Sequence, residues 1–203
     1  MMHVHRGRWW RGAEPASGVI ADDWPPAAGT DRGDRGGTAR RVPPNNSRPA
    51  TAAALTDLLR TRSLTIPVLG VSSPGLISTF DQARGGSRRH EALDVMAPRG
   101  TPVVAVEDGT VVKLFTSDAG GLTLYQFDPS GLAAYYYAHL DRYASGLAEG
   151  AAVRRGQVLG YVGSTGNADK DAPHLHFAIF RLGPERRWWE GEPVDPFPVL
   201  RRE

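Results

Sequence analysis

The order of apolar and polar residues predicts a domain built mainly from short β-strands. Apolar positions come in short runs, and glycine, proline or an Asp-Gly pair separates one run from the next. Short strands punctuated by such turns are typical of an antiparallel all-β domain. Strands are expected at residues 64–68, 93–96, 101–106, 110–115, 121–127, 132–140, 152–162 and 174–180.

One short helix is predicted before the strands. Leu55, Leu58 and Leu59 fall at helical spacing within residues 51–62, and Thr51 is a suitable N-cap. The sequence therefore predicts a short helix over residues 51–62.

Two connections can also be predicted. The Asp108-Gly109 pair lies between the runs 101–106 and 110–115, which predicts a hairpin in which these two strands pair. Residues 187–198 contain two tryptophans and three prolines, and we expect them to form a loop that closes one edge of the sheet.

The first 50 residues differ from the remainder in composition. They are rich in Gly, Pro and Arg and hold eight arginines against five acidic residues, whereas the remainder holds 16 basic and 17 acidic residues. The pI of 9.1 therefore reflects this segment and does not indicate a nucleic-acid-binding domain. We interpret residues 1–50 as a disordered basic tail and residues 51–203 as the folded domain. An arm that binds an anionic polymer is the alternative for the tail.

Membrane and export signals are not recognisable in the chain. No run approaches the ~20 apolar residues of a membrane span. The N-terminus also lacks the apolar core of a signal peptide.

Three short stretches carry candidate chemistry. They are His90-Glu91-Ala92-Leu93-Asp94, Tyr137-Ala138-His139-Leu140 and His174-Leu175-His176-Phe177, and they hold four of the six histidines. The chain has no cysteine, so imidazole and carboxylate are its available zinc ligands.

Spacing limits how these residues can share one ion. On a strand, His174 and His176 would point to the same side, with Leu175 and Phe177 on the other. The segment from His90 to Asp94 would span roughly 13 Å if fully extended, so it must bend to bring both residues to one ion. Spacing alone leaves open whether His174 or His176 is the ligand.

These stretches together resemble the lysostaphin/LytM-type zinc endopeptidases of bacterial cell walls. Further matching pieces are Ala97–Val103, Gly109–Val112, Gly156–Gly160 and Gly163–Asn167, and the resemblance covers roughly residues 64–198. Ala92 departs from the glycine of many members. The resemblance implies a barrel-like antiparallel sheet with a groove and a catalytic Zn²⁺.

The resemblance also implies roles for the site residues. His90, Asp94 and His176 would be the metal ligands, and His139 and His174 would be the catalytic residues that handle the water and the oxyanion. The implied reaction is hydrolysis of stem or cross-bridge peptides of peptidoglycan by a metal-activated water. The implied protein is a monomer in the cell envelope, periplasm or medium that binds no nucleic acid.

Two other functions are compatible with parts of the sequence. A non-catalytic relative could bind peptidoglycan or activate another hydrolase, although such relatives usually lack ligands and none is missing here. A lipoyl or biotinyl carrier shares the repeated V-x-x-G-x-V pattern, but neither Lys113 nor Lys170 lies in a carrier-like turn.

Several other residues have two readings. Tyr135-Tyr136-Tyr137 could line a peptide groove or pack in the core, and Asn167 could bind substrate or form a turn. Asp141 could orient a histidine or lie in solvent. Trp188-Trp189 could stack on a sugar or close the apolar edge.

Overall fold

The computed structural model describes residues 51–84 and 88–201, so the expected tail at residues 1–50 lies outside the described part. Its elements confirm a mostly antiparallel β domain with few helices. In chain order they are α1 Ala52–Arg62, the 3-10 turn η1 Ser73–Gly75, β1 Ala83–Arg84, β2 Arg88–Arg89, β3 Leu93–Met96, β4 Pro102–Val104, β5 Gly109–Ser117, β6 Gly121–Phe127, β7 Ala133–Tyr143, β8 Ala152–Val153, β9 Val158–Val162, β10 His174–Leu182, β11 Gly191–Val194 and α2 Phe197–Leu200.

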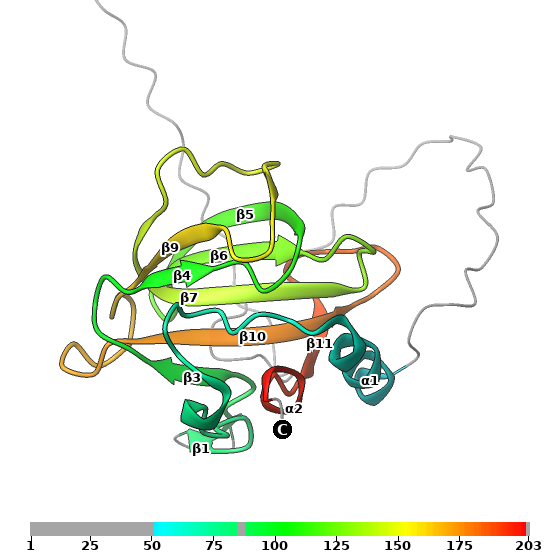
Figure 1. Cartoon of the computed structure of the whole chain (residues 1–203), viewed down its shortest axis with the longest axis horizontal. Helices are drawn as coiled ribbons and strands as arrows, with labels where there is room; N and C mark the ends of the chain where they lie inside the picture. Colours follow the sequence, from blue (N-terminus) through cyan, green and yellow to red (C-terminus); the bar gives the residue numbers. More distant parts are fainter. Residues whose placement is uncertain (1–50, 85–87, 202–203) are drawn as a thin grey trace, which may run out of the picture.

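The main sheet has nine strands, and its central strands are β7 and β10 (Figure 1). The order β11-β10-β7-β6-β5-β8 forms the path of the sheet, and every pairing is antiparallel. Strand β3 pairs with the first half of β10, and β11 pairs with its second half on the same side. Strand β9 joins β4 to the end of β7.

Alternation along β10 divides its side chains between two environments, as the sequence predicted. Leu175, Phe177 and Ile179 belong to the main apolar core, whereas Ala178 and Phe180 belong to a smaller cluster that also contains Tyr125 and Tyr136. Burial of each large apolar side chain stabilises the fold by about 1.5–3 kcal/mol. The sheet therefore keeps the even-numbered face of β10 separate from the core.

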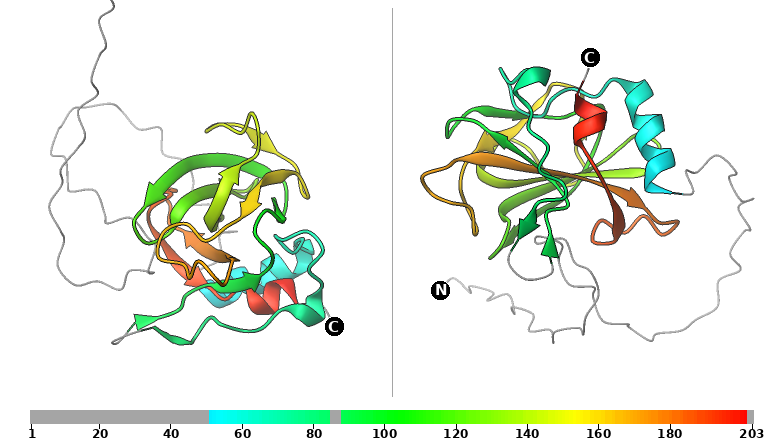
Figure 2. Two further views of the ribbon diagram at one scale, coloured as in Figure 1. Left: turned by 90° about the vertical axis from the view of Figure 1, so that its left-hand side faces the viewer. Right: turned by 90° about the horizontal axis from the view of Figure 1, so that it is seen from below.

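Helix α1 forms as the sequence predicted. The Thr51 hydroxyl accepts the Ala54 amide at 3.2 Å, which caps the first turn. Leu55 and Leu59 are fully buried, and Ser63 ends the helix with a left-handed backbone conformation. The helix lies beside α2 at one end of the molecule (Figure 2).

The end of α1 is anchored by a buried polar cluster, which we call the Arg62 network (Arg62, Glu107, Asp128 and Tyr135). An Arg62 nitrogen lies 3.2 Å from Glu107 Oε1 and 2.7 Å from Asp128 Oδ2. The Tyr135 hydroxyl also donates to Glu107. Burial raises the pKa of Asp128, but hydrogen bonds from the Ala133 amide and Arg62 outweigh burial and hold the net pKa below its ordinary value. Two buried carboxylates thus share one guanidinium.

Residues 64–68 do not form the predicted strand. The segment is extended, and Val68 makes only an isolated bridge to Val103. Pro67 has no amide hydrogen, so a continuous ladder cannot pass through this segment, although its carbonyl accepts the Val104 amide at 2.8 Å.

The predicted hairpin between residues 101–106 and 110–115 is also wrong. Strand β4 pairs with β9, whereas β5 pairs with β6 and β8. The Ala105 amide donates to the Gln157 carbonyl, and the Glu107 side chain turns inward to the Arg62 network. The Asp108-Gly109 turn therefore passes the chain from one part of the sheet to another.

The C-terminal segment is more regular than predicted. Residues 191–194 form β11 and residues 197–200 form α2, where a loop was expected. Strand β11 forms because β3 leaves the second half of β10 open for pairing. The ring centroid of Trp188 lies 5.1 Å from that of Tyr125 and 5.9 Å from that of Phe115. This packing agrees with the interpretation of Trp188 as a residue that closes the apolar edge.

No helix among residues 51–84 and 88–201 has both the length and the apolar character needed to cross a bilayer.

Candidate metal centre

Strand pairing brings the candidate residues together at one end of β10. His176 lies opposite Asp94 of β3 on one side and opposite Ala138 of β7 on the other. His139 follows Ala138 directly, and His174 is two residues before His176. The sheet therefore gathers residues that lie far apart in the sequence.

His90 reaches the same place through the predicted bend. The chain bends at Ala92, just before β3 begins, and this residue is buried. His90 and Asp94 consequently meet with His90 Nε2 and Asp94 Oδ1 3.1 Å apart, instead of lying at opposite ends of an extended segment.

Three donor atoms converge on a common point. His90 Nε2 and His176 Nδ1 are 3.1 Å apart, and each lies 3.1 Å from Asp94 Oδ1. Three ligands at about 2.0–2.1 Å from a tetrahedral ion would be separated by about 3.3–3.4 Å. The residues present therefore fit a zinc ion, and we call His90, Asp94 and His176 the ligand triad.

The environment of the ligand triad favours metal binding. His90 and His176 are buried, at 3% and 9% exposure. Burial raises the pKa of Asp94, but hydrogen bonds from His176 and His90, which form when the facing imidazole nitrogen carries a proton, outweigh burial and hold the net pKa well below its ordinary value. Asp94 would consequently offer an anionic carboxylate to a metal ion at neutral pH.

A threonine that the sequence analysis did not single out fixes the tautomer of His90. The Thr79 carbonyl accepts a hydrogen bond from His90 Nδ1 at 2.9 Å. Because a carbonyl can only accept, Nδ1 carries the proton and Nε2 of the neutral ring is available as a ligand. Thr79 lies in a segment without a recognisable motif, so no sequence signal pointed to it.

His139 occupies an irregular position in β7. Leu122 pairs with Leu140 and Leu124 with Tyr137, so Ala138 and His139 lie opposite a single residue of β6. This is a β-bulge, and His139 has a φ of 60° within it. Bulges near functional sites redirect a side chain, and a non-glycine residue at positive φ is unusual. The strand prediction did not reveal this irregularity.

His139 lies beside the ligand triad as a neutral base. Its ring centroid is 5.5 Å from that of His176 and 5.0 Å from that of His174. Burial, followed by repulsion from these two histidines, lowers the pKa of His139 to about 4. Its Nδ1 donates to the Thr165 carbonyl at 2.8 Å, so Nε2 is the unprotonated nitrogen.

His174 lies farther from the triad than His176 does. Its Nε2 is 3.8 Å from Asp94 Oδ1, compared with 3.1 Å for His176 Nδ1. Its Nδ1 donates to the Ala172 carbonyl at 2.9 Å. Spacing had left the choice between these two histidines open, and the distances place His176 in the close set.

Other candidates lie outside this arrangement. Asp141 pairs with Arg99 and Arg142, so the carbonyl of Thr165, and not Asp141, accepts from His139. The Asn167 side chain is exposed in the adjoining loop.

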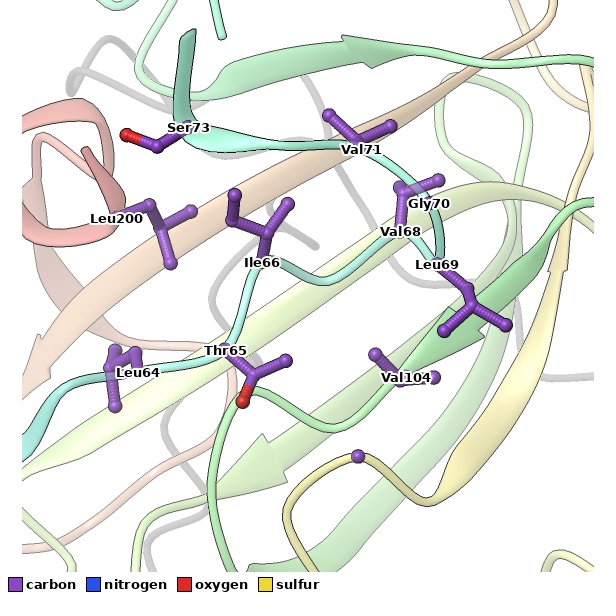
Figure 3. A pocket seen from close by; sticks show the side chains of 11 residues that line it. Leu64, Thr65, Ile66, Val68, Leu69, Gly70, Val71, Ser73, Val104 and Leu200 are labelled. Atoms are coloured by element: carbon purple, nitrogen blue, oxygen red, sulfur yellow. The ribbon is translucent and has the colours of Figure 1, made fainter. Parts of the chain in front are cut away.

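A separate apolar cavity of about 440 Å³ lies beside the extended segment that follows α1. The described residues that line it include no ionisable side chain (Figure 3). They are Leu64, Thr65, Ile66, Val68, Leu69, Gly70, Val71, Ser73, Val104, Gly156 and Leu200. This cavity offers no group for metal binding or acid–base chemistry, so the ligand triad remains the candidate site.

Comparison with known families agrees with the geometry. The model of peptidase family M23 matches residues 88–196, more than half of the chain and the segment that holds all five site residues. The chain belongs to peptidase family M23. This confirms the resemblance to lysostaphin and LytM-type enzymes.

Among curated relatives, the M23 chain is similar to an L-Ala–D-Glu endopeptidase of Bacillus subtilis. The two are 36% identical over 131 residues, which is 61% of this chain and 39% of that protein. A glycyl-glycine endopeptidase of Staphylococcus capitis is 36% identical over 113 residues, covering 55% of this chain and 29% of its own length. This M23 chain therefore spans less than half the length of both relatives.

Solved structures of M23 proteins share the fold. The catalytic domain of lysostaphin from Staphylococcus simulans has a TM-score of 0.53 and 29% identity, covering 62% of this chain and 90% of that one. A LytM protein of Ruminococcus gnavus has a TM-score of 0.58 and 31% identity, covering 73% of this chain and 64% of that one.

Proposed function

We propose that this chain is a zinc-dependent endopeptidase that hydrolyses peptide cross-links of bacterial peptidoglycan. The observation that supports it most is the ligand triad, in which three donor atoms lie 3.1 Å from one another. Two further imidazoles, His139 and His174, lie beside the triad. A structural metal site is normally closed by four protein ligands, whereas three ligands with neighbouring bases are typical of a catalytic site.

The names of the relatives support the proposed substrate class. One is named for a bond between L-Ala and D-Glu, and another for a glycyl-glycine bond. D-amino acids in peptide linkage are characteristic of bacterial cell-wall peptides. We therefore propose peptidoglycan stem or cross-bridge peptides as substrate, and the cell envelope or the medium as the place of action.

The residues would divide the reaction between holding the metal and moving a proton. His90, Asp94 and His176 would hold the zinc ion. When bound, zinc supplies Lewis acidity, which polarises the scissile carbonyl and lowers the pKa of water. His139, neutral because its pKa is lowered to about 4, would accept the proton of the attacking water on Nε2.

The same proton would leave with the product amine. After water adds to the carbonyl carbon, the carbon–nitrogen bond would break and His139 would return the proton to the leaving nitrogen, so that a carboxylic acid and an amine result, and the acid then loses its proton to solvent. His174 Nε2, 3.8 Å from Asp94 Oδ1, would donate a hydrogen bond to the developing oxyanion when that nitrogen is protonated. The resemblance implied these two roles for the pair, and the division between His139 and His174 is part of the present proposal.

The test is release of peptides from purified peptidoglycan, analysed by mass spectrometry. Zinc-loaded protein is compared with protein treated with a chelator, and with the treated protein after zinc is added back. We expect cross-linked dimers to become monomers only when zinc is present, and the masses identify the bond that is cut. If zinc binds with full occupancy and no bond is cut, the enzyme proposal is wrong, and co-sedimentation with peptidoglycan would then measure a binding function.

A further inference from the structure

Two threonines contact the candidate site in the same way, although they come from unrelated segments. The Thr79 carbonyl accepts from His90 Nδ1 at 2.9 Å, and the Thr165 carbonyl accepts from His139 Nδ1 at 2.8 Å. Each contact leaves Nε2 as the unprotonated nitrogen of the neutral ring. The backbone carbonyl of Thr79 thus fixes the tautomer of His90, a proposed ligand. The backbone carbonyl of Thr165 fixes the tautomer of His139, the proposed proton acceptor.

The Thr79 hydroxyl also holds the bend between two ligands. It donates to the Ala92 carbonyl at 3.1 Å and accepts the Asp94 amide at 3.0 Å. Ala92 is the residue at which the chain bends, and Asp94 is a member of the ligand triad. A single buried hydroxyl therefore spans the turn that brings His90 and Asp94 to one point.

The Thr165 hydroxyl makes an equivalent contact at the β-bulge. It accepts the Leu122 amide at 2.9 Å and donates to the Leu140 carbonyl at 2.8 Å. Leu122 and Leu140 are the pair that borders the bulge containing His139. The hydroxyl thus joins β6 to β7 where the regular ladder is interrupted, next to the residue with a φ of 60°.

The loop that carries Thr165 fits closely against the end of β6. A Cβ atom on Gly121 would lie 2.3 Å from the Thr165 carbonyl carbon, and a Cβ atom on Gly166 would lie 2.1 Å from the Ala119 carbonyl oxygen. Both glycines also have positive φ values, 64° and 71°. The close approach depends on glycine at both positions.

We propose that Thr79 and Thr165 are positioning residues with separate tasks. Thr79 holds His90 and Asp94 in the geometry that binds the metal, and Thr165 holds His139 in the geometry that accepts a proton. This inference rests on the proposed function, in which His90 and Asp94 bind zinc and His139 accepts a proton.

Valine and serine variants separate the two tasks, because valine keeps the shape of threonine without its hydroxyl and serine keeps the hydroxyl. Thr79→Val is expected to weaken zinc binding by about 10–100-fold, with kcat at saturating zinc within about twofold of the parent. Thr165→Val is expected to leave zinc affinity within about twofold and to lower kcat by about 10–100-fold, with KM unchanged. Thr79→Ser and Thr165→Ser are expected to restore the parent values.

A second readout does not depend on hydrolysis. Nitrogen-15 spectra of histidine-labelled, zinc-loaded protein report the tautomer of His139. We expect one tautomer, protonated on Nδ1, in the parent and in Thr165→Ser. We expect a mixture in Thr165→Val, because loss of the hydroxyl contacts to Leu122 and Leu140 displaces the backbone carbonyl, which valine keeps, from His139 Nδ1. A residue that only stabilised the fold would lower the unfolding temperature and leave this tautomer unchanged.

The possible results decide the proposal. It is wrong if both valine variants weaken zinc binding or if both lower kcat. It is also wrong if the serine variants behave as the valine variants do. Should a valine variant not fold, the alanine and serine variants at the same position carry the same comparison. If the parent cuts no peptidoglycan, the proposed function fails, whereas zinc affinity and the His139 tautomer still test the two threonines.

Discussion

The ligand triad and the Arg62 network are both buried clusters built around carboxylates, but they differ in where a positive charge comes from. In the Arg62 network, Glu107 and Asp128 share a guanidinium that the chain itself supplies. In the ligand triad, Asp94 Oδ1 meets two imidazole nitrogens at 3.1 Å, and the three residues together could hold a metal ion.

The difference separates a structural charge cluster from a functional one. Burying a carboxylate is costly unless a cation or hydrogen bonds compensate it. Arg62 completes one cluster within the protein, so that cluster should contribute to folding whether or not a metal ion is bound. The triad is suited to completion by a metal ion, so its contribution should depend on that ion.

Loss of a triad ligand should have the largest effect. His176→Ala removes one of three donors, and we expect it to abolish stoichiometric zinc binding and hydrolysis. Zinc at about 1,000 times its Kd should raise the parent's free energy of unfolding by about 4 kcal/mol, and this gain should vanish in the variant. Metal analysis, peptide release and urea unfolding with and without chelator measure these effects. Retained stoichiometric zinc would exclude His176 as a ligand.

Loss of His139 should separate chemistry from metal binding. We expect His139→Ala to lower kcat by about 10²–10⁴-fold, because the proposed proton acceptor is removed. Zinc stoichiometry should stay at the parent value, since His139 is not one of the three close donors. Single-turnover hydrolysis and metal analysis on the same sample provide the check. Unchanged hydrolysis would show that another group accepts the proton.

Loss of the internal cation should affect folding and leave metal binding intact. Arg62→Met leaves Glu107 and Asp128 buried without their guanidinium, and we expect the free energy of unfolding to fall by about 3 kcal/mol. The estimate is at the low end for a buried pair because the Arg62 side chain keeps 21% exposure. Arg60→Met, on an exposed position of the same helix, is the control and should change stability by less than about 0.5 kcal/mol. A parallel loss of zinc affinity in Arg62→Met would mean that the two clusters are coupled.

The pH dependence of folding should show the smallest effect. The pKa of Asp128 is lower in the folded protein than its ordinary value, so the unfolded chain binds more protons near that value. The stability that this carboxylate contributes is therefore present above its unfolded pKa and is lost as pH falls through the folded pKa. We expect Asp128→Asn to flatten the loss of stability below about pH 4–5, measured by urea unfolding in chelator. Asp57→Asn, exposed on α1, should keep the parent's slope, and an equal slope in both variants would contradict the assignment.

Much of the site could be predicted because its signals are local. A few neighbouring residues are enough to predict three features. They are the shared strand face of His174 and His176, the bend between His90 and Asp94, and the helix cap at Thr51. Interactions between distant segments left no such signal. The tertiary fold alone determines three other features. They are the pairing of β4 with β9, the ion pair between Glu107 and Arg62, and the contacts of Thr79 with the site. Thr165 lay within a recognised motif, but as a member of a turn it gave no sign that its hydroxyl joins two strands beside a bulge.

The anchoring of α1 has a consequence for how the boundaries of this protein should be drawn. The part matched by the family begins at residue 88, whereas Arg62 lies upstream of it. A protein shortened to the matched residues would contain Glu107 and Asp128 but not the cation that holds them. We expect such a fragment to fold poorly even though it contains every proposed catalytic group. The segment that the family model matches is therefore smaller than the unit that we expect to be needed for folding, and α1 belongs to the second.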